Sequence, residues 1–164
     1  MKKVALLFIT PMMVSISTPE PLEVKYEEPI TELKAKDIKP LITEDELVRA
    51  LIMVESRGND SAVGDRHLVG NEAVGALQIR PIMVREVNRI LRIQKIDKRF
   101  KLKDRYNREK TIQMFLIWKN FHHSDSDFET VARNWNGGPR GYKNPRTEKY
   151  WDKVEQQLNN LNNE

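Results

Sequence analysis

The 164-residue chain contains no cysteine. This absence excludes disulfide bonds, thiolate metal sites and cysteine nucleophiles. The fold must therefore be held by its hydrophobic core, and the length leaves room for one domain with such a core but not for two. Aromatic residues are also few, at 7%, whereas charged residues reach 32%, as in a globular domain with polar flanks.

Long apolar runs are absent except near the N-terminus, where two lysines precede an apolar stretch over residues 4–17. The stretch is short for a transmembrane helix, and Pro11 interrupts it. Ser15 and Ser17 are small residues at the −3 and −1 positions of a plausible cleavage site. We therefore predict a secretory signal peptide over residues 1–17, with a buried N-terminal strand as the alternative. We expect export to the periplasm, cell envelope or extracellular space, without a stable membrane anchor after cleavage.

Charge is distributed unevenly along the chain. Residues 18–46 carry nine acidic and four basic side chains and four prolines, which suits an extended, solvated segment. Residues 47–164 carry 22 basic and 15 acidic side chains. We predict an acidic linker over residues 18–42 and a basic folded domain over residues 43–164.

The folded domain is predicted to begin with a helix that carries Glu55. Thr43 and Glu46 have the spacing of a capping box, and Gly58 supplies a left-handed stop that places Glu55 in the last turn. Leucines at intervals of four put Glu55 at the edge of an apolar stripe. Partial burial and the negative end of the helix dipole both disfavour a charged carboxyl. Glu55 is thus expected to keep a proton near neutral pH, as a general acid does.

Apolar periodicity predicts further helices. Pro81 suits the first turn of one, and Asn107 is expected to cap another, with a charged surface loop over residues 95–110. The first of these helices would bury an aliphatic face made of Ile82, Val87, Ile90, Leu91 and Ile93.

Two further helix-start signals lie towards the C-terminus. Ser126 and Glu129 form a capping box that opens a helix ending at Asn134, and Thr147 starts the last helix. Residues 59–74 lack sustained periodicity and are interpreted as a loop or a short antiparallel hairpin.

Four segments resemble motifs of one enzyme family. Residues 54–59 (VESRGN) resemble the Glu-Ser motif of soluble lytic transglycosylases and goose-type lysozymes, and Ala62-Val63 looks like the next signature. Residues 75–79 (GALQI) are similar to the family's Gly-Leu-Met-Gln turn, and residues 134–139 (NWNGGP) to its Ala-Tyr-Asn-Ala-Gly-Pro segment. Tyr150 falls where the family carries a tyrosine. Four matches in the right order are hard to obtain by chance.

The resemblance implies an α+β fold, predominantly α, of lysozyme type, with a small hairpin or loop beside the catalytic helix. It also implies cleavage of peptidoglycan glycan strands by lytic transglycosylation. In that reaction one glutamate, here Glu55, protonates the oxygen between N-acetylmuramic acid and N-acetylglucosamine. It then removes the proton from the muramyl 6-hydroxyl, which closes a 1,6-anhydro ring. The substrate's own N-acetyl group can stabilise the cationic intermediate, so no second carboxylate is required.

A hydrolytic, goose-type muramidase is the alternative. Gly64-Asp65-Arg66 looks like the segment where goose-type lysozymes place an acidic residue, so Asp65 is a candidate second carboxylate. Those enzymes carry a further aspartate just after the glutamine of the turn, where this chain has Ile79-Arg80. Asp65 is about equally well explained as a turn residue, and transglycosylation is therefore the preferred interpretation.

The matched motifs also imply substrate contacts. Trp135 or Trp151 could stack on a sugar ring, and Tyr150 could orient Glu55 through its hydroxyl. Each contact has a structural alternative, such as core packing or satisfying turn backbone. The residues assigned to substrate binding are Ser56, Gln78, Ile79, Trp135, Asn136 and Tyr150.

No cofactor or metal is expected. His122 and His123 are adjacent and point in different directions, and His67 is isolated. Residues 80–110 carry twelve basic and four acidic side chains, which suit a solvated face or attraction to an anionic cell wall. The expected partner is peptidoglycan, within a cell-envelope or virion assembly. Nucleic acid is not expected, although a nucleic-acid-binding module and a non-catalytic wall-binding protein are the remaining alternatives.

Overall fold

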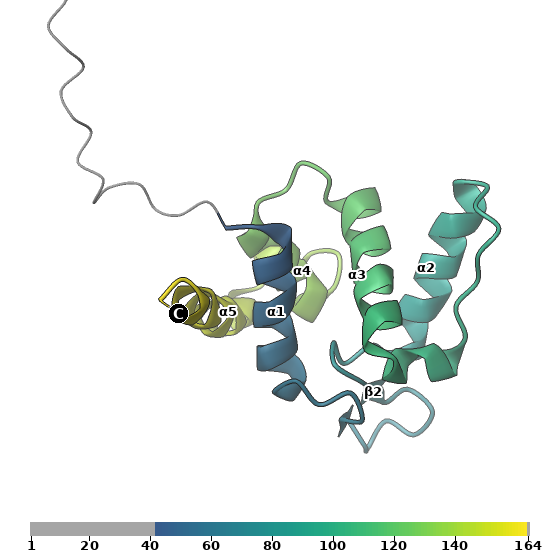
Figure 1. Ribbon diagram of the computed structural model, residues 1–164, viewed down its shortest axis with the longest axis horizontal. Helices are drawn as coiled ribbons and strands as arrows, with labels where there is room; N and C mark the ends of the chain where they lie inside the picture. The colour runs from purple at the N-terminus through teal and green to yellow at the C-terminus, as the bar shows by residue number, and fades with distance from the viewer. Residues whose placement is uncertain (1–41, 164) are drawn as a thin grey trace, which may run out of the picture. The chain divides into compact units, whose positions relative to one another are not determined.

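The computed structural model describes residues 42–163 (Figure 1). The predicted signal peptide, and the predicted linker apart from residue 42, lie outside the described residues. The described chain is mostly helical with one small antiparallel hairpin, which confirms the α+β, mainly α class. Its helices and strands are α1 Glu44–Ser56, β1 Val63–Gly64, β2 Ala73–Val74, α2 Pro81–Ile93, α3 Arg108–His122, α4 Phe128–Gly137 and α5 Glu148–Leu161. Three 3₁₀ turns complete the set: η1 Leu102–Tyr106, η2 Gly141–Lys143 and η3 Pro145–Thr147.

Helix α1 begins as the sequence predicts. The Thr43 hydroxyl accepts a hydrogen bond from the Glu46 backbone N–H at 3.3 Å, and the Glu46 carboxylate accepts from the Thr43 N–H at 2.6 Å. The end of α1 differs by one residue from the prediction. Arg57, with a φ of 54°, is the first left-handed residue, and Gly58 follows with a φ of 80°. Because the helix ends at Ser56, Glu55 lies in its last turn, as predicted.

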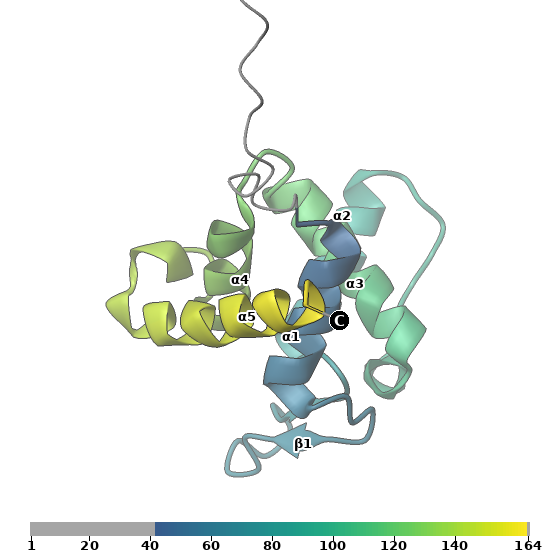
Figure 2. The ribbon, with the colours of Figure 1, turned by 60° about the vertical axis from the view of Figure 1, so that its left-hand side comes forward.

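One hydrophobic core joins all five helices of the described chain. Helix α5 packs against α1 and α4, and α2 packs against α3 (Figures 1 and 2). Fully burying an aliphatic or aromatic side chain contributes about 1.5–3 kcal/mol, so these contacts fix the helix arrangement. The largest fully buried side chains are Leu47, Leu51, Leu77, Ile79, Val87, Ile90, Leu91, Met114, Phe115, Val131, Val154 and Leu158.

The predicted apolar face of α2 is partly wrong. Ile82 and Ile93 are 63% and 52% exposed, whereas Val84 is buried. The buried stripe follows Val84, Val87 and Leu91 at helical spacing, and a residue two positions from Val84 lies on the other side of the helix. The N-terminal position of Pro81 in α2 is confirmed.

Residues 95–110 are not a simple surface loop. Phe100 is 3% exposed and Arg105 is 8% exposed, and residues 102–106 form η1. Asn107 does cap α3, because its side-chain oxygen accepts from the Lys110 N–H at 2.9 Å.

The boundaries of α4 also differ from the prediction. The cap is Asp127, whose carboxylate accepts from the Thr130 N–H at 2.7 Å, and not Ser126 with Glu129. An ionised carboxylate is the stronger acceptor for a helix N-terminus. The helix runs on past Asn134 to Gly137, so Asn136 lies in its last turn and not in a loop after a helix that ends at Asn134.

The hairpin between α1 and α2 is held at its base. Val63 pairs with Val74, and the Gly75 N–H donates to the Ala62 carbonyl at 2.9 Å. Gly75 has a φ of 80°, and a Cβ there would lie 1.8 Å from the Arg105 carbonyl oxygen, so only glycine fits. The Arg105 guanidinium in turn donates to backbone carbonyls on either side of the β2 turn, at 2.9 and 3.0 Å. Between residues 42 and 163, no helix combines the length and apolar character needed to cross a bilayer.

Candidate active site

A cavity of about 560 Å³ opens where the end of α1, the hairpin, the start of α2 and the end of α4 meet. Three consecutive elements and α4, which is distant from them in sequence, thus contribute to one site. The cavity is lined by Glu55, Asp65, Gln78, Trp135 and Asn136, which the sequence predicted as site residues. Arg80 and Met83 also line it and were not predicted as site residues.

Glu55 is the acid of this cavity. Its Oε1 accepts a hydrogen bond of 2.7 Å from the Tyr150 hydroxyl, and it forms no ion pair with any residue in the described chain. Burial raises the pKa of Glu55 to about 7; the Tyr150 hydrogen bond opposes this and the nearby charge of Asp65 adds to it. A carboxyl with this pKa is partly protonated at neutral pH, so it can both donate and accept a proton.

Tyr150 reaches Glu55 from the first turn of α5, because α5 packs along α1. The two residues are 95 positions apart in sequence. Burial, followed by the charge of Glu55 and their hydrogen bond, raises the pKa of Tyr150 well above its usual value. The phenol therefore stays protonated and keeps donating to the carboxylate.

Asp65 lies in the cavity but is already paired. Its carboxylate forms an ion pair with the guanidinium of Arg80, the last residue before α2. Asp65 has a φ of 49°, and its carbonyl accepts from the Leu68 N–H at 2.8 Å, so it is also the turn residue that the sequence offered as the alternative. Arg80 stands where goose-type lysozymes were expected to carry an aspartate, and it engages the only other carboxylate on the described lining.

Gln78 holds the turn that forms the floor of the cavity. Its side-chain nitrogen donates to the Gly75 carbonyl at 3.0 Å and to the Ala62 carbonyl at 3.4 Å. Its side-chain oxygen lies over Gly64, where an added Cβ would come within 2.4 Å. The amide therefore satisfies turn backbone, and Gly64 provides the space that its oxygen occupies.

Trp135 and Asn136 form the α4 side of the cavity. Trp135 is half-buried and packs edge-on against Phe115 and Trp118, each at 5.1 Å between ring centroids. Asn136 is exposed at the last turn of α4. The tryptophan is thus both part of the core and part of the cavity wall.

Three residues assigned to substrate binding lie outside the cavity lining: Ser56, Ile79 and Tyr150, the last of which reaches the site through its hydrogen bond to Glu55. The Ser56 hydroxyl donates to the Ile52 carbonyl at 3.2 Å, which supports the end of α1. Ile79 is 1% exposed, and its backbone pairs with Val74 at 2.9 and 3.2 Å. Trp151 packs on the hydrophobic core.

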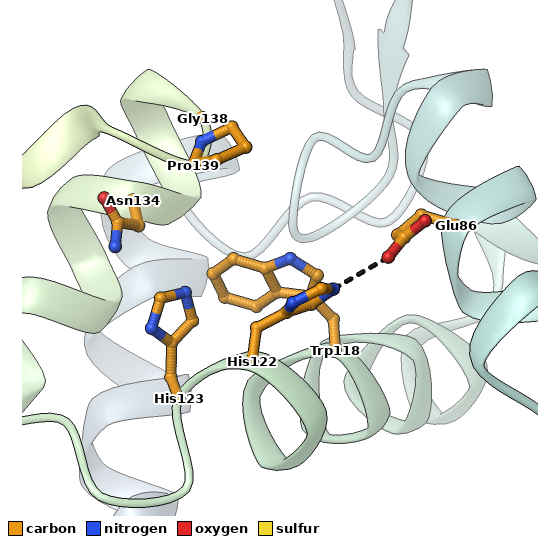
Figure 3. Close-up of a pocket in the computed structure, with 7 residues that line it drawn as sticks. All are labelled: Glu86, Trp118, His122, His123, Asn134, Gly138 and Pro139. Carbon is orange, nitrogen blue, oxygen red and sulfur yellow. Dashed lines mark hydrogen bonds and ion pairs between the residues drawn. The ribbon is translucent and has the colours of Figure 1, made fainter. Parts of the chain in front are cut away.

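A second cavity, of about 390 Å³, adjoins the first because Gly138 lines both (Figure 3). Trp118 forms its floor, and the His122 Nε2 lies 2.7 Å from Glu86 Oε1. Arg89 donates two further hydrogen bonds to Glu86, at 2.6 and 2.7 Å, and these chiefly lower the pKa of Glu86 to about 2.

The sequence did not reveal this second cavity. The i,i+3 spacing of Glu86 and Arg89 is a local signal that could have predicted their ion pair, but nothing in the sequence links this pair to His122. Across residues 42–163, no three acidic or histidine side chains gather in a group that could hold a metal ion.

Comparison with known proteins gives a partial relationship. No family model matches the chain. A stretch of 34 residues, or 21% of the chain, is 56% identical to a lysozyme of Magallana gigas. This stretch spans a quarter of the length of that lysozyme, so the similarity is to a part of each protein. The chain is thus lysozyme-like over this stretch.

Proposed function

We propose that the protein is a peptidoglycan-cleaving lytic transglycosylase in which Glu55 acts first as general acid and then as general base. The observation that carries the proposal is the environment of Glu55. Its carboxyl is largely removed from water, accepts a hydrogen bond from a tyrosine hydroxyl, forms no ion pair within residues 42–163, and faces a cavity of about 560 Å³. The similarity to a lysozyme supports a glycosidase-type enzyme in general.

In the proposed first step, Glu55 donates its proton to the glycosidic oxygen between N-acetylmuramic acid and N-acetylglucosamine. The bond from the anomeric carbon to that oxygen breaks, and its electron pair leaves with the oxygen. The substrate's N-acetyl group stabilises the positive charge that develops at the anomeric carbon. The Glu55 carboxylate then takes the proton of the muramyl 6-hydroxyl while that oxygen bonds to the anomeric carbon. No water is consumed, and the acid is regenerated.

The state of Asp65 favours transglycosylation over hydrolysis. Most inverting and retaining hydrolases use a second carboxylate that is free to act as base or nucleophile. Asp65 is the only other carboxylate on the described lining, and it is bound to Arg80. A muramidase that uses Asp65 together with Glu55 is the second candidate, since the pair is partly exposed and a substrate could displace it.

The proposal also covers binding and location. The Trp135 ring face, the Asn136 amide and the Gln78 side-chain oxygen are the proposed contacts to the glycan, because all three line the cavity with Glu55. We propose export through the N-terminal segment, since peptidoglycan lies outside the cytoplasmic membrane, and action within a cell-envelope or virion assembly.

The test is digestion of purified peptidoglycan with product analysis by mass spectrometry. Wild-type protein should release muropeptides with 1,6-anhydro ends, which are lighter by one water than reducing ends. Glu55→Gln should reduce the rate by about 100- to 10,000-fold, the range for loss of a general acid. Glu109→Gln, an exposed glutamate on α3, is the charge-matched control and should retain the wild-type rate.

The other outcomes separate the alternatives. Reducing ends from wild-type protein would establish a muramidase and give Asp65 a catalytic role. Absence of any released product, or equal activity of Glu55→Gln and wild type, would overturn glycan cleavage by Glu55 and favour a non-catalytic wall-binding or nucleic-acid-binding module.

A further inference from the structure

A basic groove runs between α2 and the segment that follows it. After α2 the chain turns back and runs alongside the helix to η1 (Figures 1 and 2). The groove encloses about 480 Å³. We call it the α2–loop groove, and it is lined by Arg85, Asn88, Arg89, Arg92, Lys95, Ile96, Asp97, Lys98 and Arg99.

The loop side of this groove is fixed to the helix. The Asn88 side-chain nitrogen donates to the Phe100 carbonyl at 2.9 Å, and its oxygen accepts from the Phe100 N–H at 2.8 Å. The Phe100 ring is buried, and the Ile96 N–H donates to the Leu91 carbonyl at 2.9 Å. The basic side chains therefore project from an ordered backbone, which lowers the entropic cost of binding a partner.

Most of the positive charge in the groove is uncompensated. Arg89 is neutralised by Glu86, and Lys98 donates to the Gln113 side chain. The groove lining holds a single acidic side chain, Asp97. In the part of the chain that the structure describes, four further cations of the groove have no acidic partner: Arg85, Arg92, Lys95 and Arg99.

Two aliphatic side chains are exposed among these cations. Ile93 ends α2 and is 52% exposed, and Ile96 lines the groove and is 49% exposed. None of the residues that line the groove is aromatic, so it offers no platform for stacking nucleobases. Basic side chains around exposed aliphatic ones are the pattern of surfaces that bind anionic lipid headgroups and insert shallowly into the acyl region.

We propose that the α2–loop groove, with Ile93 beside it, docks the protein on an anionic phospholipid membrane. Met83, in the first turn of α2, lines the Glu55 cavity, and Ile93 lies about 15 Å farther along the helix axis at 1.5 Å per residue. The aliphatic side chain expected to insert thus lies at the opposite end of α2 from the Glu55 cavity. The inference goes beyond the proposed glycan cleavage and does not depend on it.

Vesicle binding of the full chain tests the charge component. Binding is measured on phosphatidylcholine vesicles with and without phosphatidylglycerol, at low and high salt. The triple variant Arg92→Gln, Lys95→Gln, Arg99→Gln should bind the anionic vesicles about 100-fold more weakly, since each basic residue near an anionic surface contributes about fivefold. The matched control removes three exposed cations elsewhere: Arg146→Gln, Lys149→Gln and Lys153→Gln. The N-terminal segment is the same in all variants, so its own contribution cancels.

A second measurement locates the contact. Because the chain has no cysteine, Ile96→Cys and the exposed α5 control Gln156→Cys can each be labelled at one position with an environment-sensitive fluorophore. Only the label at position 96 should shift to the blue with anionic vesicles. Equal spectra at the two positions, or equal vesicle binding by the two triple variants, would overturn the proposal. Binding of DNA or polyphosphate at the groove without vesicle binding would instead assign it to a soluble polyanion.

Discussion

Glu55 and Glu86 face adjoining cavities from neighbouring helices, and their electrostatic environments are opposite. Glu55 is partly exposed as a residue, but its carboxyl is shielded from water and has one hydroxyl partner, and this burial raises its pKa to about 7. Glu86 is held by Arg89 and His122, and their hydrogen bonds lower its pKa to about 2. The Glu55 carboxyl is the more deeply buried of the two, so burial and the cationic partners of Glu86 both separate the two pKa values.

The comparison shows that burial and the supply of cations together set the protonation state. Desolvation penalises a carboxylate unless a guanidinium or imidazolium compensates its charge. Arg80 lines the same cavity as Glu55, and its guanidinium forms an ion pair with Asp65. Among residues 42–163, Arg80 is thus paired with Asp65 and forms no ion pair with Glu55, which is consistent with the proposed role of Glu55 as an acid.

The largest expected effect is on stability at alkaline pH. The pKa of Glu55 is above its unfolded value of 4.5, so its ionisation opposes folding increasingly as pH rises from about 4.5 to 7. Glu55→Gln should raise the free energy of unfolding by about 2–3 kcal/mol at pH 8 and change it little at pH 4. Urea unfolding followed by circular dichroism at both pH values measures this. An equal effect at pH 4 and pH 8 would contradict a raised pKa.

Glu86→Gln should act in the opposite direction. The pKa of Glu86 is below its unfolded value, so its stabilising contribution is complete above about pH 4.5 and disappears as pH falls towards 2. After allowance for solvent screening of the exposed Arg89 pair, we expect a loss of about 1–2 kcal/mol at pH 7. The loss should shrink at pH 3.5 in the same unfolding experiment. A gain in stability of Glu86→Gln at pH 7 would contradict the lowered pKa of Glu86, because both glutamates would then destabilise the fold when charged.

Tyr150→Phe should make Glu55 a weaker acid. The hydroxyl donates to the carboxylate and stabilises its charged form, so without it the pKa of Glu55 rises. The alkaline limb of the activity profile should move to higher pH, and stability should fall by about 1 kcal/mol for the lost hydrogen bond. Asp65→Asn should move the alkaline limb of the activity profile to lower pH, because removing the Asp65 charge lowers the pKa of Glu55. Tyr142→Phe, an exposed tyrosine, is the control and should leave the limb in place.

The smallest expected effect is on the ratio of reducing ends to anhydro ends among the products. Arg80→Gln releases the Asp65 carboxylate into the Glu55 cavity, where it could activate water. A minor fraction of reducing ends should then accompany the anhydro ends in the muropeptide spectrum. Arg66→Gln, a neighbouring exposed arginine, should leave the product ratio unchanged. An unchanged ratio in Arg80→Gln would mean that the ion pair does not determine the choice of product.

The features that sequence predicted are those set by short-range contacts. The Thr43–Glu46 capping box spans three residues, and Pro81 at a helix start follows from its own backbone restriction. The last-turn position of Glu55 follows from the nearby helix stop. The partner Tyr150 was found through the motif resemblance, since no local pattern links residues so far apart.

The features that sequence missed depend on tertiary packing or on a choice between adjacent candidate residues. Asp127 and Ser126 are adjacent candidate caps, and only the path of the chain decides between them. Ile82 is aliphatic yet exposed, because the core contacts the other face of α2. The Asp65–Arg80 and Glu86–His122 pairs join elements that only the folded core brings together.

The hairpin base has a practical consequence for engineering. The Gly75–Ala62 hydrogen bond and the Arg105 guanidinium hold both ends of the turn, independently of the tip between them. At the tip, Val69 is 86% exposed and Gly70 has open space where a Cβ would be. Residues 69 and 70 are therefore a suitable insertion point for an epitope tag or a peptide linker, because added length there would not displace Gln78.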